Sequence, residues 1–252
     1  MEFKVENGDG IDSWKEVTLV YSAALRQMET KMQILNDEFQ HVHQYNPIEH
    51  IKARIKTPES IVKKLKRYGQ ESTIDNMVKY INDIAGIRII CSFTSDIYRI
   101  ADMIRDQRDI KVIAVKDYIT YPKASGYKSY HMIVSIPVYL SDRTVDTKVE
   151  VQIRTVAMDF WASLEHKIHY KFEGDAPENI KNELVECARM VSDLDARMLS
   201  LNEEILAISK KREEEKQLNS AARGKENIAL RTARARRISQ ARFFFMVKTV
   251  MG

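Results

Sequence analysis

Apolar side chains recur every three or four residues along two long stretches, one in each half of the chain. In residues 12–40 this spacing predicts one amphipathic helix. Its apolar face is formed by Trp14, Val17, Tyr21, Leu25, Met28, Met32, Leu35 and Phe39. In residues 178–217 the spacing of three and four continues without a break, as in a coiled-coil seam. That seam contains Leu184, Cys187, Val191, Leu194, Met198, Leu201, Ile205 and Ile208. It would pack either against the first helix or against another subunit.

The region between these helices predicts a mixed β-sheet with helices packed on it. Strand patterns occur at residues 85–91, 110–115, 129–138 and 147–154. Helices are predicted at 95–107 and 156–169. Another begins near residue 58, where Thr57 can cap the first turn and Pro58 suits the first helical position. This order indicates an α/β or α+β fold with long N- and C-terminal helices.

The composition is typical of a soluble globular protein, with 44% hydrophobic and 30% charged residues. Two cysteines, Cys91 and Cys187, are too few for a disulfide framework. The first residues, MEFKVENGDG, lack the basic and apolar regions of a secretory signal. No apolar stretch approaches the roughly 18 residues of a membrane span. We therefore expect a cytoplasmic protein that does not enter a membrane.

The net charge of +4 is concentrated at the C-terminal end. Residues 220–252 hold eight of the 40 basic residues and one of the 36 acidic ones, so residues 1–219 carry 32 basic and 35 acidic residues. This distribution argues against a protein that coats DNA. It divides the chain into a globular part, 1–219, and a basic tail, 220–252. The tail is compatible with an RNA-binding arm or with a disordered, solvated extension.

The strand predicted at 147–154 has one apolar and one polar face, because side chains of a strand alternate between its two sides. The apolar face contains Val149, Val151 and Ile153. The polar face contains Lys148, Glu150, Gln152 and Arg154. A half-solvated strand is the simpler interpretation, and the functional interpretation is a cleft face with Glu150 at its centre.

A second polar face lies on the helix that begins near residue 58. Its members recur at helical spacing and are Ser60, Lys63, Lys64 and Arg67. Arg54 and Lys56 precede this helix in an extended segment. Several cations beside the N–H donors of a helix N-terminus suit a polyphosphate, although most charged helix faces are simply solvated.

Two further features are compatible with nucleotide chemistry. In KDYITYPKASGYKSYH, residues 116–131, a turn delivers Tyr127 to the start of a strand, beside Lys128 and His131. An aromatic ring near cations suits base stacking, although a lone loop tyrosine is more often half-buried. Asp83 precedes strand 85–91 and either ends a turn or pairs with Glu150 as a Mg²⁺ site.

Taken in order, these motifs resemble the RelA/SpoT-type synthetase domain, and most closely the small single-domain alarmone synthetases of bacteria. The matching segments are RIKTPESIVKKLKR, DIAGIRIIC, KDYITYPKASGYKSYH and VEVQIRTVAMDFWASLEHKIHYK, within about residues 45–172. The resemblance implies a nucleotidyltransferase-like synthetase fold. It also implies transfer of the β,γ-pyrophosphate of ATP to the ribose 3′-OH of GDP or GTP. The products would be ppGpp or pppGpp, the alarmones of the bacterial stringent response.

The resemblance implies roles for individual residues on the ATP side. Arg54 and Arg88 would enclose the adenine. The ATP phosphates would be held by Lys56, Ser60, Lys64 and Arg67. Asp83 and Glu150 would bind Mg²⁺, and Glu150 would also accept the proton of the 3′-OH.

On the acceptor side, the resemblance places Tyr127 against the guanine and Gln152 close to the acceptor nucleotide. The side chains that would face acceptor or transferred phosphates are Lys116, Lys128 and His131. His131 would thereby join Glu150 and Asp83 in the catalytic group.

The longer family members carry a hydrolase domain with a His-Asp metal motif, and this chain has no His-Asp dipeptide. We therefore expect alarmone synthesis without hydrolysis. Some small members are homotetramers, so a homo-oligomer is expected, in agreement with the seam at 184–208. Two alternative functions stay open: a toxin-type relative that pyrophosphorylates tRNA, and an RNA-binding regulatory protein that uses the basic tail.

Overall fold

The structure is a computed structural model that describes the backbone of residues 14–43, 45–171 and 177–250, and the side chains of 14–42, 45–168 and 177–217. The chain divides into two units, Met1–Leu199 and Ser200–Gly252. All candidate site residues belong to the first unit, so the site is built within one unit of the chain.

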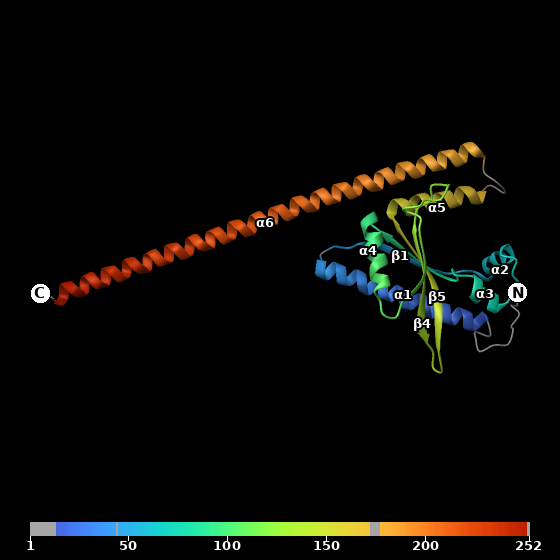
Figure 1. Cartoon of the computed structure of the whole chain (residues 1–252), viewed down its shortest axis with the longest axis horizontal. Helices are drawn as coiled ribbons and strands as arrows, with labels where there is room; N and C mark the ends of the chain where they lie inside the picture. Colours follow the sequence, from blue (N-terminus) through green and yellow to red (C-terminus); the bar gives the residue numbers. More distant parts are fainter. Residues whose placement is uncertain (1–13, 44, 172–176, 251–252) are drawn as a thin grey trace. The chain divides into compact units, whose positions relative to one another are not determined.

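A five-stranded mixed sheet forms the centre of this unit (Figure 1). Its strands are β1 (Ile48–Ile55), β2 (Ala85–Cys91), β3 (Lys111–Asp117), β4 (Tyr130–Tyr139) and β5 (Thr144–Thr155). Their order across the sheet is β1-β2-β5-β4-β3. Strands β2 and β5 are parallel, while the other neighbouring pairs are antiparallel. The predicted mixed sheet and its four predicted strands are confirmed, with small shifts at the strand ends.

The helices of the described chain include every helix that the sequence predicts. They are α1 (Trp14–His43), α2 (Pro58–Arg67), α3 (Ile74–Tyr80), α4 (Thr94–Arg105), α5 (Val156–Lys171) and α6 (Glu178–Val250). Thr57 caps α2 as predicted, because its side-chain oxygen accepts the backbone N–H of Ser60. Helix α3 is not predicted by the periodicity, since its seven residues are too few to show a repeat.

Strand β1 is also absent from the sequence-based expectations. It is an edge strand whose side chains are mostly exposed, and its pairing with β2 is irregular between Ile48 and His50. An edge strand that pairs on one side needs no strict alternation of apolar residues. Its sequence, IEHIKARI, therefore gives no clear strand signal. The strand is important for the site because it places Arg54 opposite Gly86 of β2.

The apolar face of the sheet packs against α1 and α4 in a single core. Val17, Tyr21 and Met28 of the predicted α1 stripe are buried in it, together with Val149 and Val151 of β5. Helix α4 contributes its own buried face to the same cluster. Since side chains of β5 alternate, this burial directs the polar side chains of β5 to the opposite face of the sheet.

Helix α6 runs to Val250 and extends past the end predicted at residue 217. Residues 218–250 are rich in alanine and arginine and contain no proline, a composition that favours a continued helix. The backbone of the predicted basic tail is thus helical up to Val250, whereas its side chains lie outside the described residues. Within the described part, no helix has an apolar segment long enough to cross a membrane.

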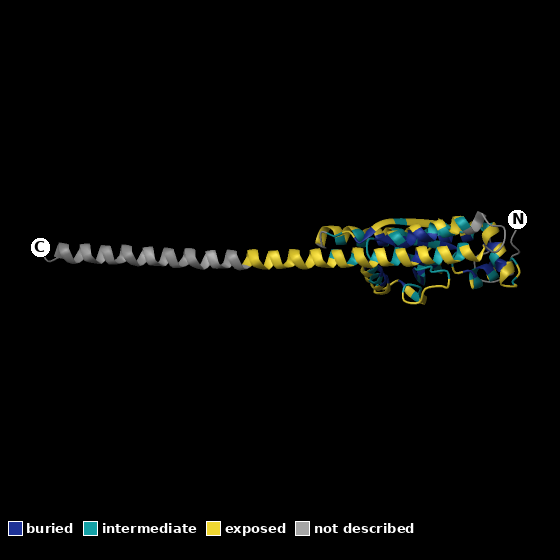
Figure 2. Cartoon of the chain, turned by 90° about the horizontal axis from the view of Figure 1, so that it is seen from above, coloured by how far each residue is buried: buried dark blue, intermediate teal, exposed yellow. Residues whose placement is uncertain are grey.

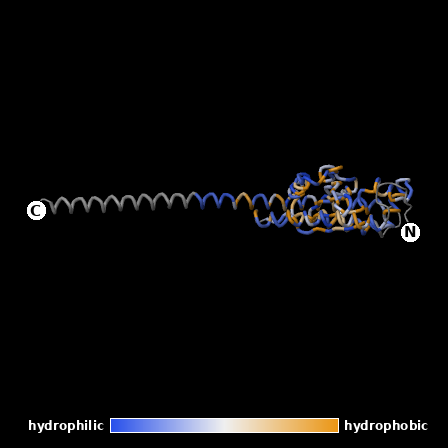
Figure 3. The backbone as a smooth tube through the Cα atoms, turned by 90° about the horizontal axis from the view of Figure 1, so that it is seen from below, coloured by the Kyte–Doolittle hydropathy of each residue, from blue (hydrophilic) through white to orange (hydrophobic). Residues whose placement is uncertain are grey.

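The apolar seam of α6 packs on α5 at its beginning and is exposed further along. Leu184 and Val191 of the predicted seam cluster with Ala188 of α6 and with Trp161 and Ala162 of α5. Cys187, which was also expected in the seam, is exposed, and Ala188 is buried in its place. From Leu194, which is 55% exposed, the seam faces solvent (Figure 2). Its exposed members are Leu194, Met198, Leu201, Ile205 and Ile208. A charged, hydrophilic stretch follows before residue 217 (Figure 3). Within the described chain, the seam therefore contacts α5 at its beginning, and its later members are exposed.

We expect the substitution Met28→Ala to destabilise the fold, because the side chain of Met28 is completely buried between α1 and the sheet. The expected loss in the free energy of unfolding is about 2–5 kcal/mol. The control Leu19→Ala truncates a half-exposed side chain of the same helix and should change it by less than about 0.5 kcal/mol. Urea unfolding followed by circular dichroism measures both, and equal losses would contradict the packing of α1.

Candidate active site

A cavity of about 150 Å³ opens on the polar face of the sheet, over β1, β2 and β5. It is lined by Lys52, Ala53, Arg54, Asp83, Gly86, Ile87, Arg88, Glu150 and Gln152. The parallel register sets Gly86 beside Glu150 and Arg88 beside Gln152. Because Gly86 has no side chain, the floor between Arg54 and Glu150 stays open. The structure thus gathers in one cavity residues that are about 100 positions apart in the sequence.

Asp83 lies between two lysines beside this cavity. Nζ of Lys56 is 2.8 Å from Oδ2 of Asp83, and Nζ of Lys64 is 2.8 Å from Oδ1. Burial alone would raise the pKa of Asp83, but the hydrogen bonds and charges of the two lysines outweigh it and hold that pKa below its ordinary value. The group is therefore one carboxylate with two ammonium ions, and its net charge is positive.

The two other predicted phosphate contacts on α2, Ser60 and Arg67, lie toward opposite ends of the helix. Ser60 lies in the first turn, where Oγ1 of Thr57 donates to its Oγ at 3.0 Å. Arg67 is the last residue of α2 and is exposed, two helical turns from Ser60. The structure therefore brings Lys56 and Lys64 to Asp83, which lines the cavity, whereas Arg67 lies at the far end of the helix.

Glu150 is held on the cavity side by two neighbours. Nδ1 of His131 is 3.6 Å from its Oε1, and Nε2 of Gln152 donates to its Oε2 at 2.8 Å. Burial raises the pKa of Glu150, yet the His131 and Gln152 interactions outweigh burial and the nearby charge of Asp83 and lower the pKa below its ordinary value. Glu150 is therefore a largely buried, ionised carboxylate at neutral pH.

Tyr127 reaches the same group from the loop before β4. Its hydroxyl is 2.9 Å from Nε2 of His131, and Nζ of Lys123 lies 4.8 Å from its ring centre. The preceding residue, Gly126, has a φ of +84°, and a Cβ on it would lie 2.5 Å from Cβ of Ala188 on α6. Glycine is thus required for the loop to pass α6 and to present Tyr127 beside His131.

The two other predicted acceptor-side cations lie further away. Lys116 is exposed on β3 and pairs with His131 across the β3–β4 ladder, so both side chains share one face of the sheet. Lys128 lines a separate cavity between its loop and the first turns of α6, together with Ala188 and Arg189. The structure therefore places Lys116 near the site and does not bring Lys128 to Glu150.

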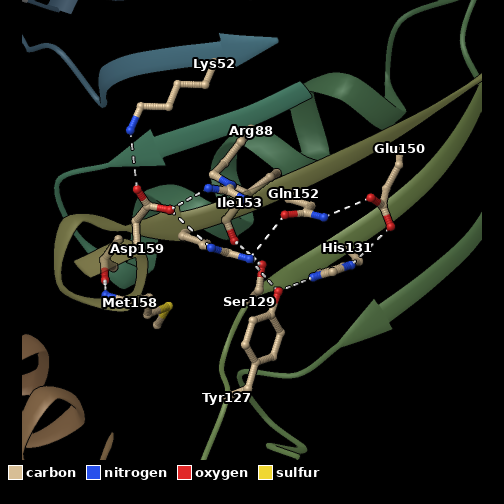
Figure 4. A network of polar contacts seen from close by, with 12 residues as sticks. Lys52, Arg88, Tyr127, Ser129, His131, Glu150, Gln152, Ile153, Met158 and Asp159 are labelled. Carbon is tan, nitrogen blue, oxygen red and sulfur yellow. Dashed lines mark hydrogen bonds and ion pairs between the residues drawn. The ribbon is translucent and has the colours of Figure 1, made fainter. Parts of the chain in front are cut away.

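Two residues of the site are missing from the sequence-based candidates. Arg154 on β5 is 3.1 Å from Asp159 on α5, and the same oxygen of Asp159 is 3.1 Å from Arg88 (Figure 4). Arg154 follows Glu150 and Gln152 in the strand alternation, so the sequence predicts its position on this face but assigns it no role. Its burial and its partner depend on the tertiary contact between β5 and α5, for which the sequence has no local signal.

The residues present fit a divalent metal ion bound together with phosphates. Asp83 and Glu150 both line the cavity and are both ionised. Mg²⁺ is typically held by one or two carboxylates plus substrate phosphates rather than by an all-protein cage. Accordingly, the described residues contain no group of three or more acidic, histidine or cysteine ligands.

Comparison with known proteins places this architecture in a family. A family model described as "Region found in RelA / SpoT proteins" matches residues 53–175. The GTP pyrophosphokinase YwaC of Bacillus subtilis (strain 168) is 48% identical over 77% of this chain and 93% of its own length.

Solved structures agree with this match. The crystal structure of the small alarmone synthetase 2 from Bacillus subtilis is 47% identical, with a TM-score of 0.70 over 76% of this chain and 98% of that one. The small alarmone synthetase 1 from the same organism, bound to its product pppGpp, is 33% identical with a TM-score of 0.70, over 76% of this chain and 97% of that one. The chain therefore belongs to the RelA/SpoT family, within its small alarmone synthetases.

Proposed function

We propose that the chain transfers the β,γ-pyrophosphate of ATP to the ribose 3′-OH of GDP or GTP and so forms ppGpp or pppGpp. The observation that carries this proposal is the cavity in which two ionised carboxylates, Asp83 and Glu150, lie beside clustered cations. A relative that is 48% identical is named a GTP pyrophosphokinase. These relatives do not favour the alternative of a tRNA-modifying toxin.

On the donor side, the paired lysines are the proposed ligands of the ATP phosphates. Lys56 and Lys64 share one carboxylate, so a polyphosphate with more negative charge than Asp83 attracts both. Ser60 and Arg67 extend this binding surface along α2. Arg54 and Arg88 line the cavity as the proposed contacts of the adenine.

Glu150 is the proposed general base. Its lowered pKa keeps it ionised at neutral pH, ready to accept the proton of the 3′-OH. The 3′ oxygen then forms a bond to the β-phosphorus of ATP. The bond between that phosphorus and the oxygen bridging it to the α-phosphate breaks, and AMP leaves with the bridging oxygen. Gln152 and His131 orient the Glu150 carboxylate throughout.

Asp83 and Glu150 are the residues that would hold Mg²⁺. When bound, this ion supplies charge neutralisation at the phosphate oxygens. The remaining task of the chain is to position two nucleotides, which contributes most of the catalysis in phosphoryl-type transfer.

On the acceptor side, Tyr127 is the proposed stacking partner of the guanine, because its ring lies beside cations at the edge of the site. Gln152 and His131 are the proposed neighbours of the acceptor ribose and phosphates. Lys116 shares their face of the sheet and extends the positive field. Lys128 would contact only phosphates that reach the loop beside α6.

We also propose that the chain works in the cytoplasm as a homo-oligomer, most simply a homotetramer. The support is the exposed seam of α6, in which Leu194 and Met198 are about half exposed. Apolar side chains at heptad spacing are typical of helices that pair with other helices. A contact of the basic tail with RNA would be an additional property.

The proposal is tested by incubating the full chain with ATP and Mg²⁺ and with GDP, GTP or tRNA in separate reactions. We expect AMP together with ppGpp or pppGpp, resolved by anion-exchange chromatography. Pyrophosphorylated tRNA without guanosine products would support the toxin-type alternative and contradict the proposal.

We expect the substitution Glu150→Gln to abolish transfer while the protein stays folded. Loss of a positioned general base typically costs about 10²–10⁴-fold in rate, and a lost metal ligand adds to this. The control Glu71→Gln changes an exposed glutamate outside the cavity and should keep wild-type turnover. Near-normal turnover of Glu150→Gln, with an unchanged circular dichroism spectrum, would contradict the role of Glu150.

The pH dependence of kcat/KM tests how Glu150 is kept ionised. The carboxylate form is active, so activity falls as the pH drops through the pKa of Glu150. Since that pKa lies below its ordinary value, the acid limb of the wild type should lie below the ordinary glutamate range. Gln152→Ala removes one hydrogen-bond donor to the Glu150 carboxylate, so burial should raise the pKa of Glu150 in this variant. The acid limb of its pH profile should therefore move to higher pH. Gln33→Ala, an exposed control on α1, should not shift it. An unshifted limb in Gln152→Ala would contradict this account.

A further inference from the structure

One carboxylate oxygen connects two arginines that come from different strands. Oδ1 of Asp159 lies 3.1 Å from Nη1 of Arg88 on β2 and 3.1 Å from Nη1 of Arg154 on β5 (Figure 4). Asp159 lies in the first turn of α5, where the helix dipole favours a negative charge. The side chain of Arg154 is only 5% exposed, and that of Asp159 is 11% exposed. The other oxygen, Oδ2, lies 3.7 Å from Nζ of the more exposed Lys52. A single acidic group therefore holds together two guanidinium groups and one ammonium group that would otherwise repel one another.

Arg154 distributes its donors over the acceptor side of the site. Its Nη2 donates to the hydroxyl of Tyr127 at 2.6 Å and to Oε1 of Gln152 at 3.2 Å. Its Nε donates to Oγ of Ser129 at 3.3 Å. A planar guanidinium can make these contacts together with the Asp159 pair, whereas a lysine ammonium cannot. Arg154 thus fixes Tyr127 and Gln152 relative to Asp159.

The contact between Arg154 and Tyr127 also sets the direction of the next hydrogen bond. Arginine only donates, so the oxygen of Tyr127 accepts and its hydrogen points elsewhere. The available acceptor is Nε2 of His131 at 2.9 Å. The other ring nitrogen of His131, Nδ1, lies 3.6 Å from Oε1 of Glu150. The chain of contacts therefore runs from Arg88 through Asp159, Arg154 and Tyr127 to the catalytic carboxylate.

We propose that Asp159 and Arg154 are positioning residues that couple the donor and acceptor subsites, so that each nucleotide binds more tightly when the other is present. The inference rests on the proposed function, in which Arg88 contacts the adenine and Tyr127 contacts the guanine. A nucleotide that immobilises Arg88 also immobilises Asp159 and, through it, Arg154. Tyr127 is then already ordered when the second nucleotide arrives, and the entropy of ordering is lost only once. The effect is reciprocal because it is a coupling free energy between two binding equilibria.

The test measures equilibrium binding to the full chain with the non-transferable analogue α,β-methylene ATP. Isothermal titration calorimetry gives its affinity with Mg²⁺ alone and with Mg²⁺ plus saturating GTP. We expect GTP to raise the affinity of the wild type for the analogue at least about fivefold. In Asp159→Asn, which keeps the size of the side chain and removes its charge, this ratio should fall toward one.

A second variant separates the coupling from the folding of the site. Tyr127→Phe keeps the ring that stacks on the base and removes only the hydroxyl bonded to Arg154 and His131. Its affinity for GTP alone should fall less than about tenfold, while the ratio measured with the analogue should again approach one. The matched control is Asp142→Asn, which neutralises an ion-paired aspartate in the exposed β4–β5 turn and should keep the wild-type ratio.

Several outcomes would overturn the proposal. A wild-type ratio of one, with normal conversion of GTP, would remove the coupling and leave the proposed function standing. A folded Asp159→Asn with the wild-type ratio would show that the pair is merely structural. If Asp159→Asn fails to fold, as judged by its thermal unfolding, the ratio of Tyr127→Phe decides, and an unchanged ratio there would refute the coupling. A wild type that neither binds the analogue nor converts GTP would refute the coupling and the proposed function together.

Discussion

The parallel pairing of β2 with β5 is the constraint on which the rest of the site depends. It is the parallel step in an otherwise antiparallel sheet, and its register sets Gly86 beside Glu150 and Arg88 beside Gln152. A slip of one residue would turn Glu150 toward the core and Val151 toward the cavity. The complete burial of Val149 and Val151 prevents that slip. The hydrophobic core therefore fixes the face of the sheet on which the Glu150 carboxylate lies.

Charge in the site is organised around two carboxylates that each bind more than one cation. Asp83 holds Lys56 and Lys64, and Asp159 holds Arg88, Arg154 and, at 3.7 Å, the more exposed Lys52. Each group has an excess of positive charge, although residues 1–219 are net acidic. Each carboxylate thus keeps close together several cations that would otherwise repel one another. The net charge of the chain conceals this local distribution.

The sequence predicts those features that follow from a local repeat. The two faces of β5 follow from strict alternation, and the buried stripe of α1 follows from helical spacing. Strand β1 could not be predicted in this way, because an edge strand with charged side chains carries little apolar signal. The pair of Arg154 and Asp159 could not be predicted either. The strength of this ion pair depends on its burial and on Arg88 of the neighbouring strand. Neither can be read from the residues next to Arg154 or Asp159 in the sequence.

For the helical C-terminal segment, the sequence alone is compatible with two different structures. Its composition of alanine and basic residues suits an exposed helix as well as a disordered chain, and a simple charge count does not separate them. The apolar seam of α6 was likewise compatible with two neighbours. The structure assigns the first part of the seam to α5 through Leu184 and Val191, with Ala188 buried where the sequence predicted Cys187.

The close passage of Gly126 over Ala188 has a consequence for how this protein can diverge. A Cβ at residue 126 would lie 2.5 Å from that of Ala188, and the backbone of Gly126 is in a region that L-amino acids avoid. A larger residue at either position would displace the loop that carries Tyr127. Natural variation in α6 is therefore constrained at position 188 by the loop that carries Tyr127.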